Sequence, residues 1–285
     1  MVVLSYSKMH GQSFEFNELV SFEYSLVPSV GETEARMFNL SFTTKKATEI
    51  GLIGLSLSYS NHQFSFFEVD NDLENSLEVF HIVEPRFFYS GSIKNNWSLN
   101  ISMSPILSSS LINDITNEDL IYNGKITISK DWYNNKNFNS FTLGIGRGQI
   151  LGEPQFFPII SFNKEIGERL SYSLGFPKSG LWYLVNERNL IHLRGMLSGI
   201  YANTSATTIF NGDQIQHTKL KFSGLDIGLE HIYRLQPNIS ATTRIGFLSN
   251  NSLELLDSNQ NLVYNFEPNG SAYLTMGIKY NLNKK

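Results

Sequence analysis

Near its C-terminus the chain reads Tyr273-Leu274-Thr275-Met276-Gly277-Ile278-Lys279-Tyr280-Asn281-Leu282, and this stretch alternates apolar and polar residues throughout. The apolar row consists of Leu274, Met276, Ile278, Tyr280 and Leu282. The opposite row consists of Tyr273, Thr275, Gly277, Lys279 and Asn281. A period of two residues is that of a β-strand whose faces meet different surroundings. We therefore expect one face to meet hydrocarbon or a core, and the other to meet water or a polar interior.

The same stretch resembles the C-terminal signal by which bacterial outer-membrane barrel proteins are recognised for insertion. That signal has a polar residue, a glycine, an aromatic residue and a final apolar residue, and here these are Thr275, Gly277, Tyr280 and Leu282. The tail Asn283-Lys284-Lys285 departs from the pattern, because the usual signal ends on its aromatic residue. The resemblance implies an outer-membrane β-barrel that the barrel-assembly machinery inserts.

Composition agrees with a barrel in lipid. Charged residues make up 17% of the 285 residues, against roughly a quarter in an average soluble domain. About half of the strand positions of a membrane barrel face acyl chains and cannot carry charge. The net charge of −4 gives no reason to expect nucleic-acid binding, and the absence of cysteine excludes disulfides. The first residues, 1 to 6, show no export signal, which counts against this interpretation.

Alternating segments recur along the chain and predict an all-β, antiparallel, up-and-down transmembrane β-barrel of about 14 strands (12–14). We expect residues 18–285 to form this barrel and residues 1–17 to form an N-terminal periplasmic segment or plug. We expect short periplasmic turns at residues 45–46, 94–96, 134–136, 167–168, 186–189 and 236–238. We expect long extracellular loops at residues 61–76, 105–119, 204–217 and 249–269. The least regular strands are those over residues 156–164 and 181–185, which prolines interrupt or bound.

Aromatic residues cluster at the predicted strand ends beside the short turns. Such amphipathic rings favour the headgroup level of a membrane. The alternative is that Trp and Tyr simply favour strands. The predicted membrane-interface aromatics are Trp97, Trp132, Tyr133, Tyr233 and Tyr280.

Two segments in the middle of the chain carry a resemblance to a known family. They read Ile159-Ile160-Ser161-Phe162-Asn163-Lys164 and Leu170-Ser171-Tyr172-Ser173-Leu174-Gly175-Phe176-Pro177. The chain resembles an uncharacterised outer-membrane β-barrel family of Bacteroidota. The resemblance implies a location and an architecture, and it implies no shared activity.

Charged residues on the polar rows are the main functional feature. Those assigned to the lumen are Glu23, Glu84, Arg86, Lys125, Arg194, Asp226, Glu230, Arg244 and Lys279. They could line a pore and sort solutes by charge. They could instead form a structural ion-pair network in a closed lumen, and we favour this second reading because interior charges of opposite sign pair wherever geometry permits.

Little in the sequence predicts catalysis or metal binding. No histidine pair has the spacing of metal ligands, so we expect no metal and no cofactor. Asp213 and His217 share one long loop, but no nucleophile motif accompanies them. We therefore do not expect an enzyme.

The sequence leaves three functional classes open. The first is a passive channel or uptake pore for small solutes in the bacterial outer membrane, with lipid as its surroundings. The second is a non-enzymatic accessory subunit that binds other outer-membrane proteins and has a closed lumen. The third is a soluble β-sandwich binding module, because periodicity alone cannot tell an inner face from an outer one.

Overall fold

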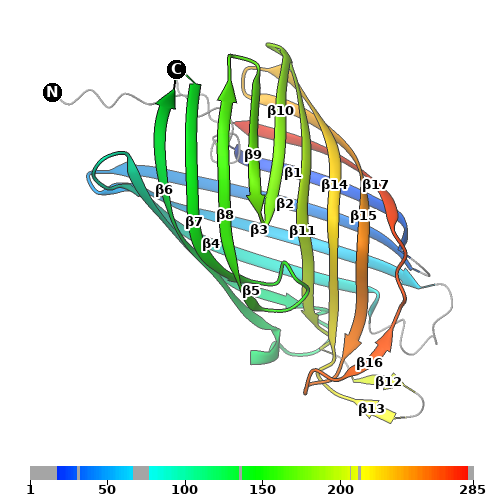
Figure 1. Ribbon diagram of the computed structural model, residues 1–285. Coiled ribbons are helices and arrows are strands. Elements are labelled where there is room, and N and C mark those ends of the chain that lie inside the picture. Colours follow the sequence, from blue (N-terminus) through cyan, green and yellow to red (C-terminus); the bar gives the residue numbers. More distant parts are fainter. Residues whose placement is uncertain are drawn as a thin grey trace.

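The computed structural model describes residues 18–30, 33–66, 77–134, 137–205, 207–210 and 213–281. Within these residues, 14 strands close into one antiparallel barrel (Figure 1). The barrel strands are β1 (Glu18–Val30), β2 (Thr33–Thr48), β3 (Gly51–Phe66), β4 (Val79–Ser92), β5 (Trp97–Ser109), β6 (Leu120–Asn134), β7 (Asn137–Gly148), β8 (Gln155–Ile166), β9 (Leu170–Phe176), β10 (Lys178–Asn186), β11 (Asn189–Asn203), β14 (Lys219–Gln236), β15 (Ile239–Leu256) and β17 (Ser271–Asn281). The connections contain η1 (Asn117–Asp119), β12 (Thr208–Phe210), β13 (Asp213–Ile215) and β16 (Leu262–Asn265).

Neighbouring barrel strands follow one another along the chain, so the topology is up-and-down. The barrel closes where β1 pairs with β17, from Glu18 opposite Asn281 to Leu26 opposite Leu274. The predicted fold class and strand number are therefore confirmed. The predicted N-terminal segment 1–17 lies outside the described residues. No helix within the described ranges has the length and hydropathy of a membrane span.

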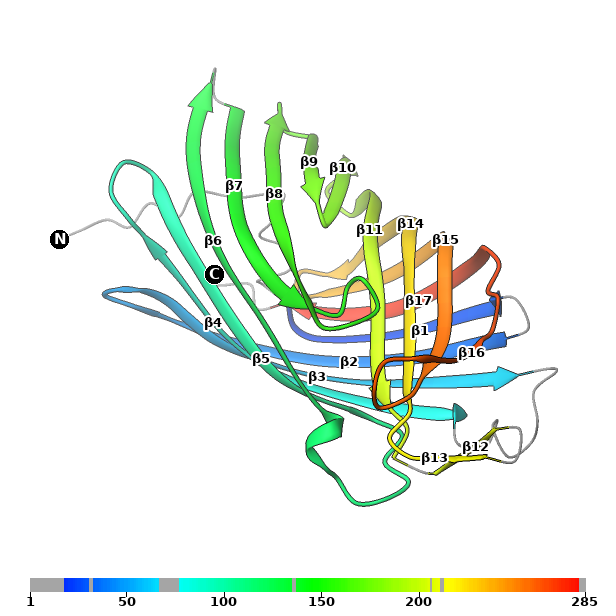
Figure 2. The same cartoon turned by 60° about the horizontal axis from the view of Figure 1, so that its bottom comes forward.

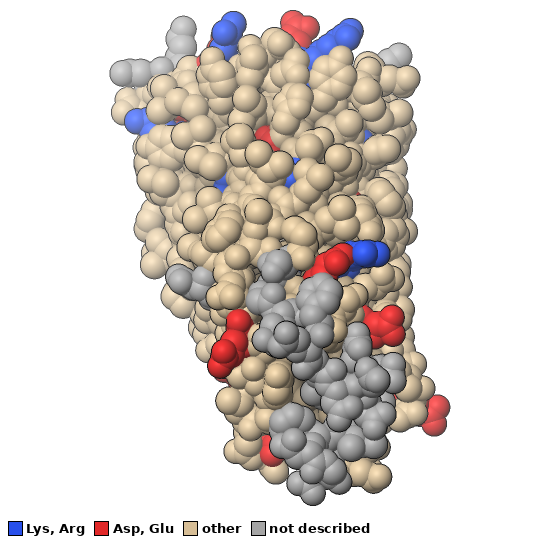
Figure 3. All heavy atoms as spheres, turned by 90° about the vertical axis from the view of Figure 1, so that its right-hand side faces the viewer, with Lys and Arg blue, Asp and Glu red and all other residues tan. Residues whose placement is uncertain are grey.

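The apolar rows lie on the outer surface of the wall. On β17, Met276 is 55% exposed and Ile278 is 54% exposed. Thr275, on the opposite, polar row of the same strand, is 2% exposed. On β6, Ile126 is exposed and Thr127 is buried. The middle of the outer wall in Figure 3 is mostly free of charge, and Lys, Arg, Asp and Glu lie mainly along its upper edge and in its lower part. A wall that is apolar outside and polar inside is the pattern of a barrel in lipid.

Several predicted turns and loops are shifted, because the strands are longer than the alternating segments suggested. The turn after β2 lies at Glu49 and Ile50 rather than at residues 45–46. Polar residues 61–63 pair within β3, and Pro105 lies inside β5. The connection between β9 and β10 is Pro177 alone. Ladder hydrogen bonding thus continues through polar residues that resemble a loop in the sequence.

The two ends of the lumen differ in chemistry. At the end that carries the long loops, apolar side chains from opposite walls meet and exclude solvent. This apolar lumen cluster consists of Val27, Ala35, Phe64, Phe66, Leu77, Phe80, Ala202, Leu220, Phe222, Leu248, Leu253, Leu255, Phe266 and Tyr273. Its strand residues come from β1–β4 on one side and from β11, β14, β15 and β17 on the other, and β11, β14 and β15 cross the direction of β1–β4 in Figures 1 and 2. Each fully buried Phe or Leu contributes roughly 1.5–3 kcal/mol.

Two strands that are not neighbours around the barrel meet at the long-loop end. The end of β5 pairs in parallel with the end of β11, at Ser109 opposite Asn203, although β6–β10 separate these strands around the barrel. The backbone N–H of Ser110 donates to the carbonyl oxygen of Asn203 at 3.0 Å, and the Ser108 hydroxyl donates to the carbonyl oxygen of Tyr201 at 2.8 Å. These bonds narrow the barrel mouth.

A polar cluster, buried except for Glu118, holds the β5–β6 loop against this junction. We call it the mouth lock, and it consists of Glu118, Asp119, Asn203 and Lys219. Lys219 Nζ donates to Asn203 Oδ1 at 3.0 Å and forms an ion pair with Glu118 at 2.9 Å. Asn203 Nδ2 donates to Asp119 Oδ1 at 2.8 Å. Burial alone would raise the pKa of Asp119, but hydrogen bonds from Ser109, Asn203 and backbone and side chain of Thr116 outweigh it and lower that pKa.

Candidate functional site

Six of the nine predicted lumen charges meet in one place. Arg194 lies on β11, Asp226 and Glu230 on β14, Arg244 on β15, Lys279 on β17 and Glu23 on β1, and these strands are consecutive neighbours around the wall. The register sets Glu230 opposite Arg244. Because all six side chains occupy the in-facing row, they converge in the lumen. With Glu18, His192 and Tyr273 they form what we call the charge network.

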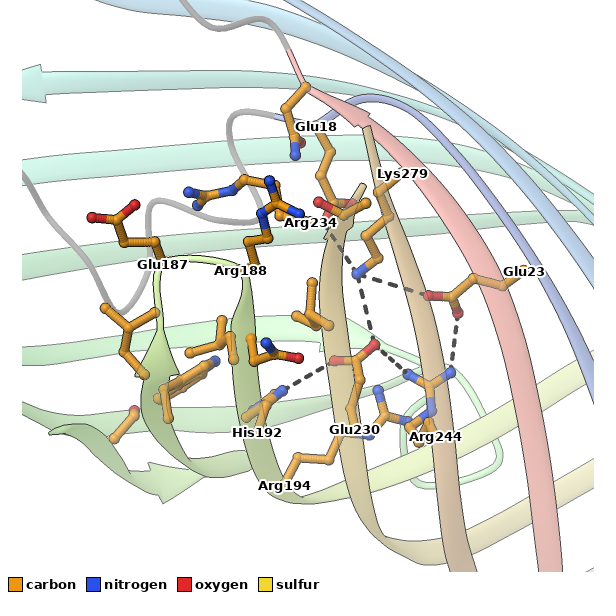
Figure 4. A pocket seen from close by; sticks show the side chains of 18 of the residues that line it. Glu18, Glu23, Glu187, Arg188, His192, Arg194, Glu230, Arg234, Arg244 and Lys279 are labelled. Carbon is orange, nitrogen blue, oxygen red and sulfur yellow. Dashed lines mark hydrogen bonds and ion pairs between the residues drawn. The ribbon is translucent and has the colours of Figure 1, made fainter. Parts of the chain in front are cut away.

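Lys279 and Arg244 each contact more than one carboxylate. Arg244 lies 3.0 Å from a Glu23 oxygen and 3.8 Å from a Glu230 oxygen. Lys279 Nζ lies 3.1 Å from Glu18 and 3.8 Å from both Glu23 and Glu230 (Figure 4). Burying a charge costs desolvation free energy, and contacts with several opposite charges offset that cost. A single unpaired ion in the same place would have no such compensation.

A second part of the network joins Arg194, Asp226 and Tyr273. Arg194 forms an ion pair with Asp226, and the Tyr273 hydroxyl donates to Asp226 Oδ1 at 2.5 Å. The Tyr273 ring crosses Gly246, where a Cβ atom would lie 2.4 Å from the ring. Glycine at this position therefore lets Tyr273 reach Asp226, and the ring joins the charge network to the apolar lumen cluster.

His192 connects the network to an aromatic residue on the neighbouring strand. Its Nδ1 lies 3.3 Å from Glu230 Oε2. Its ring stacks on Trp182 of β10, with ring centroids 4.5 Å apart and an interplanar angle of 9°. This contact fixes the orientation of the imidazole beside the carboxylate.

The lumen is hollow between the charge network and the short turns. A cavity of about 370 Å³ lies there. Its wall combines ionic side chains of the network with apolar side chains, and its rim is formed by the β10–β11 and β14–β15 turns. Figure 4 shows Glu187, Arg188 and Arg234 on the turn side of the network. The lumen therefore opens toward the short turns and is packed toward the long loops.

The other three predicted lumen charges lie elsewhere on in-facing rows. Glu84 and Arg86 form an ion pair with each other on β4 at 2.8 Å. Lys125 of β6 lies opposite Ser102 and Gly146. Glu84 and Arg86 thus pair with each other and not with the charge network among the described contacts. A charged residue on an in-facing row therefore joins the charge network only when its strand also lies close to the other members.

Three members of the network were not among the predicted site residues. Glu18 is turned inward because a β-bulge between Glu18 and Val20 shifts the register of β1. His192 occupies the same row as Arg194, two residues away, and this spacing was a usable signal. Tyr273 occupies the polar row of the final strand, where a large ring was itself an indication of packing inside the lumen.

The predicted interface aromatics lie toward the short-turn ends of their strands. Trp97 opens β5, and Lys130 Nζ lies 5.5 Å from its ring centroid. Tyr233 and Tyr280 lie on outward rows near the ends of β14 and β17. Trp132 lies 6.1 Å from Phe162, measured between ring centroids. Tyr133 differs, because it shares the in-facing row and lies opposite Phe138.

The predicted insertion signal falls on the last strand. Thr275 and Gly277 face inward, and Tyr280 faces outward. Leu282 lies outside the described residues. The role of these residues in insertion stays a prediction.

The candidate site is ionic rather than metal-binding in character. Over the described part of the chain, no group of three or more His, Asp or Glu side chains is arranged to hold a metal ion. The Asp213 and His217 pair considered from the sequence lies in the β11–β14 connection, away from the charge network.

Solved structures that match this chain over most of its length include two porins and a phospholipase. The NanC porin has 11% sequence identity and a TM-score of 0.44, and the match covers 92% of this chain and 100% of that one. The KdgM porin has 8% identity and a TM-score of 0.42 over 93% and 99%. Outer membrane phospholipase A from Escherichia coli has 11% identity and a TM-score of 0.40 over 93% and 91%. Likenesses this distant do not establish a shared activity.

A comparison with curated proteins found no match. A family model does match, and it spans residues 30–281, which include all but the first part of the barrel. The chain therefore belongs to the family described as "Domain of unknown function (DUF6268)".

Proposed function

We propose that the protein is an integral barrel of the bacterial outer membrane, with its short turns in the periplasm and its long loops outside. The support is the wall itself, whose outward row is apolar on strand after strand. Each of the 14 barrel strands pairs with a neighbour on both sides, so the wall has no edge strand. Lipid favours such closure because it cannot satisfy free backbone groups.

Within the membrane, we infer that the barrel is a closed, non-enzymatic accessory subunit rather than an open diffusion pore. The observation that carries this inference is the apolar lumen cluster. Phe80, Leu220 and Leu255 are fully buried where a pore would need a wetted path. Ions avoid such a constriction because an apolar passage of this kind dewets. The β5–β11 junction and the mouth lock support the same conclusion.

Planar-bilayer conductance of purified, folded protein tests the closed lumen. Wild-type protein should be silent, whereas Phe64→Ala/Phe80→Ala should give unitary steps, because the two rings are 6.1 Å apart inside the cluster. The matched control is Phe22→Ala/Phe87→Ala, which removes two rings from the lipid-facing surface. Heat-modifiable gel mobility verifies that each variant is folded. Reproducible steps from wild-type protein would refute the closed barrel.

An accessory role also predicts a partner. Extraction of native membranes in mild detergent should yield other envelope proteins at stoichiometric amounts with this chain. A chain that purifies alone under those conditions argues against the role.

An uptake pore is the second candidate, and the cavity on the short-turn side favours it. A solute could enter this cavity and meet the charge network before reaching the apolar lumen cluster. Passage would then require the cluster to part. Under this alternative, wild-type protein conducts and Arg194→Ala changes its ion selectivity.

A further inference from the structure

Two arginines stand side by side at the rim of the cavity. Arg188 lies in the β10–β11 turn, and Arg234 lies near the end of β14. The backbone N–H of Arg234 donates to the carbonyl oxygen of Arg188 at 2.8 Å, which holds the two residues together. Both side chains line the cavity on the turn side of the charge network (Figure 4).

These two guanidinium groups differ from the cations deeper in the lumen. Arg194, Arg244 and Lys279 each form an ion pair. In the described part of the chain, no carboxylate forms an ion pair with Arg188 or Arg234, and Glu187 at the same rim is joined to neither. Two like charges held close repel each other, and an anion between them converts this repulsion into two charge-assisted hydrogen bonds.

The wall next to the arginines is apolar. Leu184, Leu190 and Ile232 line the cavity below the rim, and the Trp182 indole lies beyond them, stacked on His192. A volume of about 370 Å³ is at the lower end of the range for small-molecule sites, roughly 300–1,000 Å³. The space thus suits a ligand with a charged head and a short apolar body.

We propose that this cavity binds a small organic anion, with its carboxylate or phosphate on Arg188 and Arg234 and its apolar body against Leu190 and Ile232. Cations are disfavoured because the carboxylates of the charge network are already paired and the two arginines outnumber Glu187, the further carboxylate at the rim. The anion can be a free solute or the headgroup of a phospholipid, since both present the same chemistry to the arginines.

Trp182 provides a reporter inside the cavity. In a Trp97→Phe/Trp132→Phe background it is the remaining tryptophan of the chain. Its fluorescence is measured in dodecylmaltoside micelles during titration with hexanoate, hexanol and hexylamine. Hexanoate should saturate the signal at a concentration at least tenfold lower than either of the others.

Variants separate binding at the rim from uptake into micelles. Arg188→Gln/Arg234→Gln should weaken hexanoate binding at least tenfold, and Arg188→Lys/Arg234→Lys should restore part of the loss. Arg86→Gln, on β4, is the control and should leave binding unchanged. Equal affinity of wild type and the double Gln variant, or equal affinity for hexylamine and hexanoate, would overturn the proposal.

Phospholipid competition identifies the source of the anion. Displacement of hexanoate by phosphatidylglycerol but not by phosphatidylcholine assigns the rim to lipid headgroups. Displacement by neither assigns it to a free solute. The fluorescence signal does not depend on conductance, so a conducting barrel that still binds hexanoate refutes the closed lumen without touching this site.

Discussion

Removing the charge of Glu230 tests whether the charge network holds the barrel wall together. Glu230 is 4% exposed and lies near Arg244, Lys279 and His192. Loss of one partner from a buried ion pair costs about 3–5 kcal/mol. In Glu230→Gln, Arg244 keeps Glu23 and Lys279 keeps two other carboxylates. We therefore expect the free energy of unfolding to fall by the lower figure, about 3 kcal/mol.

The assay is urea unfolding of the folded barrel in detergent micelles, followed by tryptophan fluorescence. Glu34→Gln is the matched control, because Glu34 also pairs with an arginine, Arg36, whose side chain is 54% exposed. An exposed pair contributes about 0–1 kcal/mol. The reasoning is refuted when Glu230→Gln costs no more than Glu34→Gln at an unchanged dependence on urea.

Three further predictions concern the lipid-facing wall, the packing of Tyr273 inside the lumen and the barrel mouth. Ile278→Arg should lower the free energy of unfolding in lipid vesicles by about 2–4 kcal/mol. The control Ile112→Arg, on an exposed loop, should change this free energy by about 0.5 kcal/mol or less. Equal effects of the two substitutions would argue against a lipid-facing Ile278. Gly246→Ala should destabilise the barrel by about 1–3 kcal/mol in the same unfolding assay, because the added Cβ would clash with the Tyr273 ring. The control Gly195→Ala has open space around the added Cβ and should be neutral. A neutral Gly246→Ala would contradict the close packing of Tyr273 over Gly246. The lowered pKa of Asp119 means that its carboxylate stabilises the folded mouth above its unfolded pKa of about 3.9 and loses this effect as the pH falls through the folded value. Wild type should therefore be more stable than Asp119→Asn at pH 7, and the two unfolding midpoints should converge below about pH 4; a difference that persists in acid would disprove the lock.

Much of the barrel could be predicted because a strand's side chains alternate with a fixed period. Met276 and Ile278 on one row and Thr275 on the other determine which face meets lipid, once the wall is known to close. The same period brings Glu230 and Arg244 together, since both occupy the in-facing row of adjacent strands. Row and strand order were enough to predict that opposite charges would meet.

Features that depend on interrupted periodicity or on distant strands could not be predicted in this way. The bulge beside Glu18 reverses the direction of a side chain, and no residue type marks it. Phe64 and Leu220 occupy the in-facing row, but only the crossing of the walls brings their strands into one cluster. The sequence did contain a sign of the apolar lumen cluster. The in-facing row changes from polar to apolar residues toward the long-loop end, as at Phe64 and Phe66 of β3.

The orientation of the wall in lipid is tested most directly by two neighbouring labels on β6. The chain has no cysteine, so Ile126→Cys and Lys125→Cys each accept a single bimane fluorophore. Both residues are exposed, and they lie on opposite rows. In vesicles, brominated phospholipid should quench the label at residue 126, and aqueous iodide should quench the label at residue 125. The reverse pattern would contradict the account, because it would place the apolar row inside and the polar row in lipid.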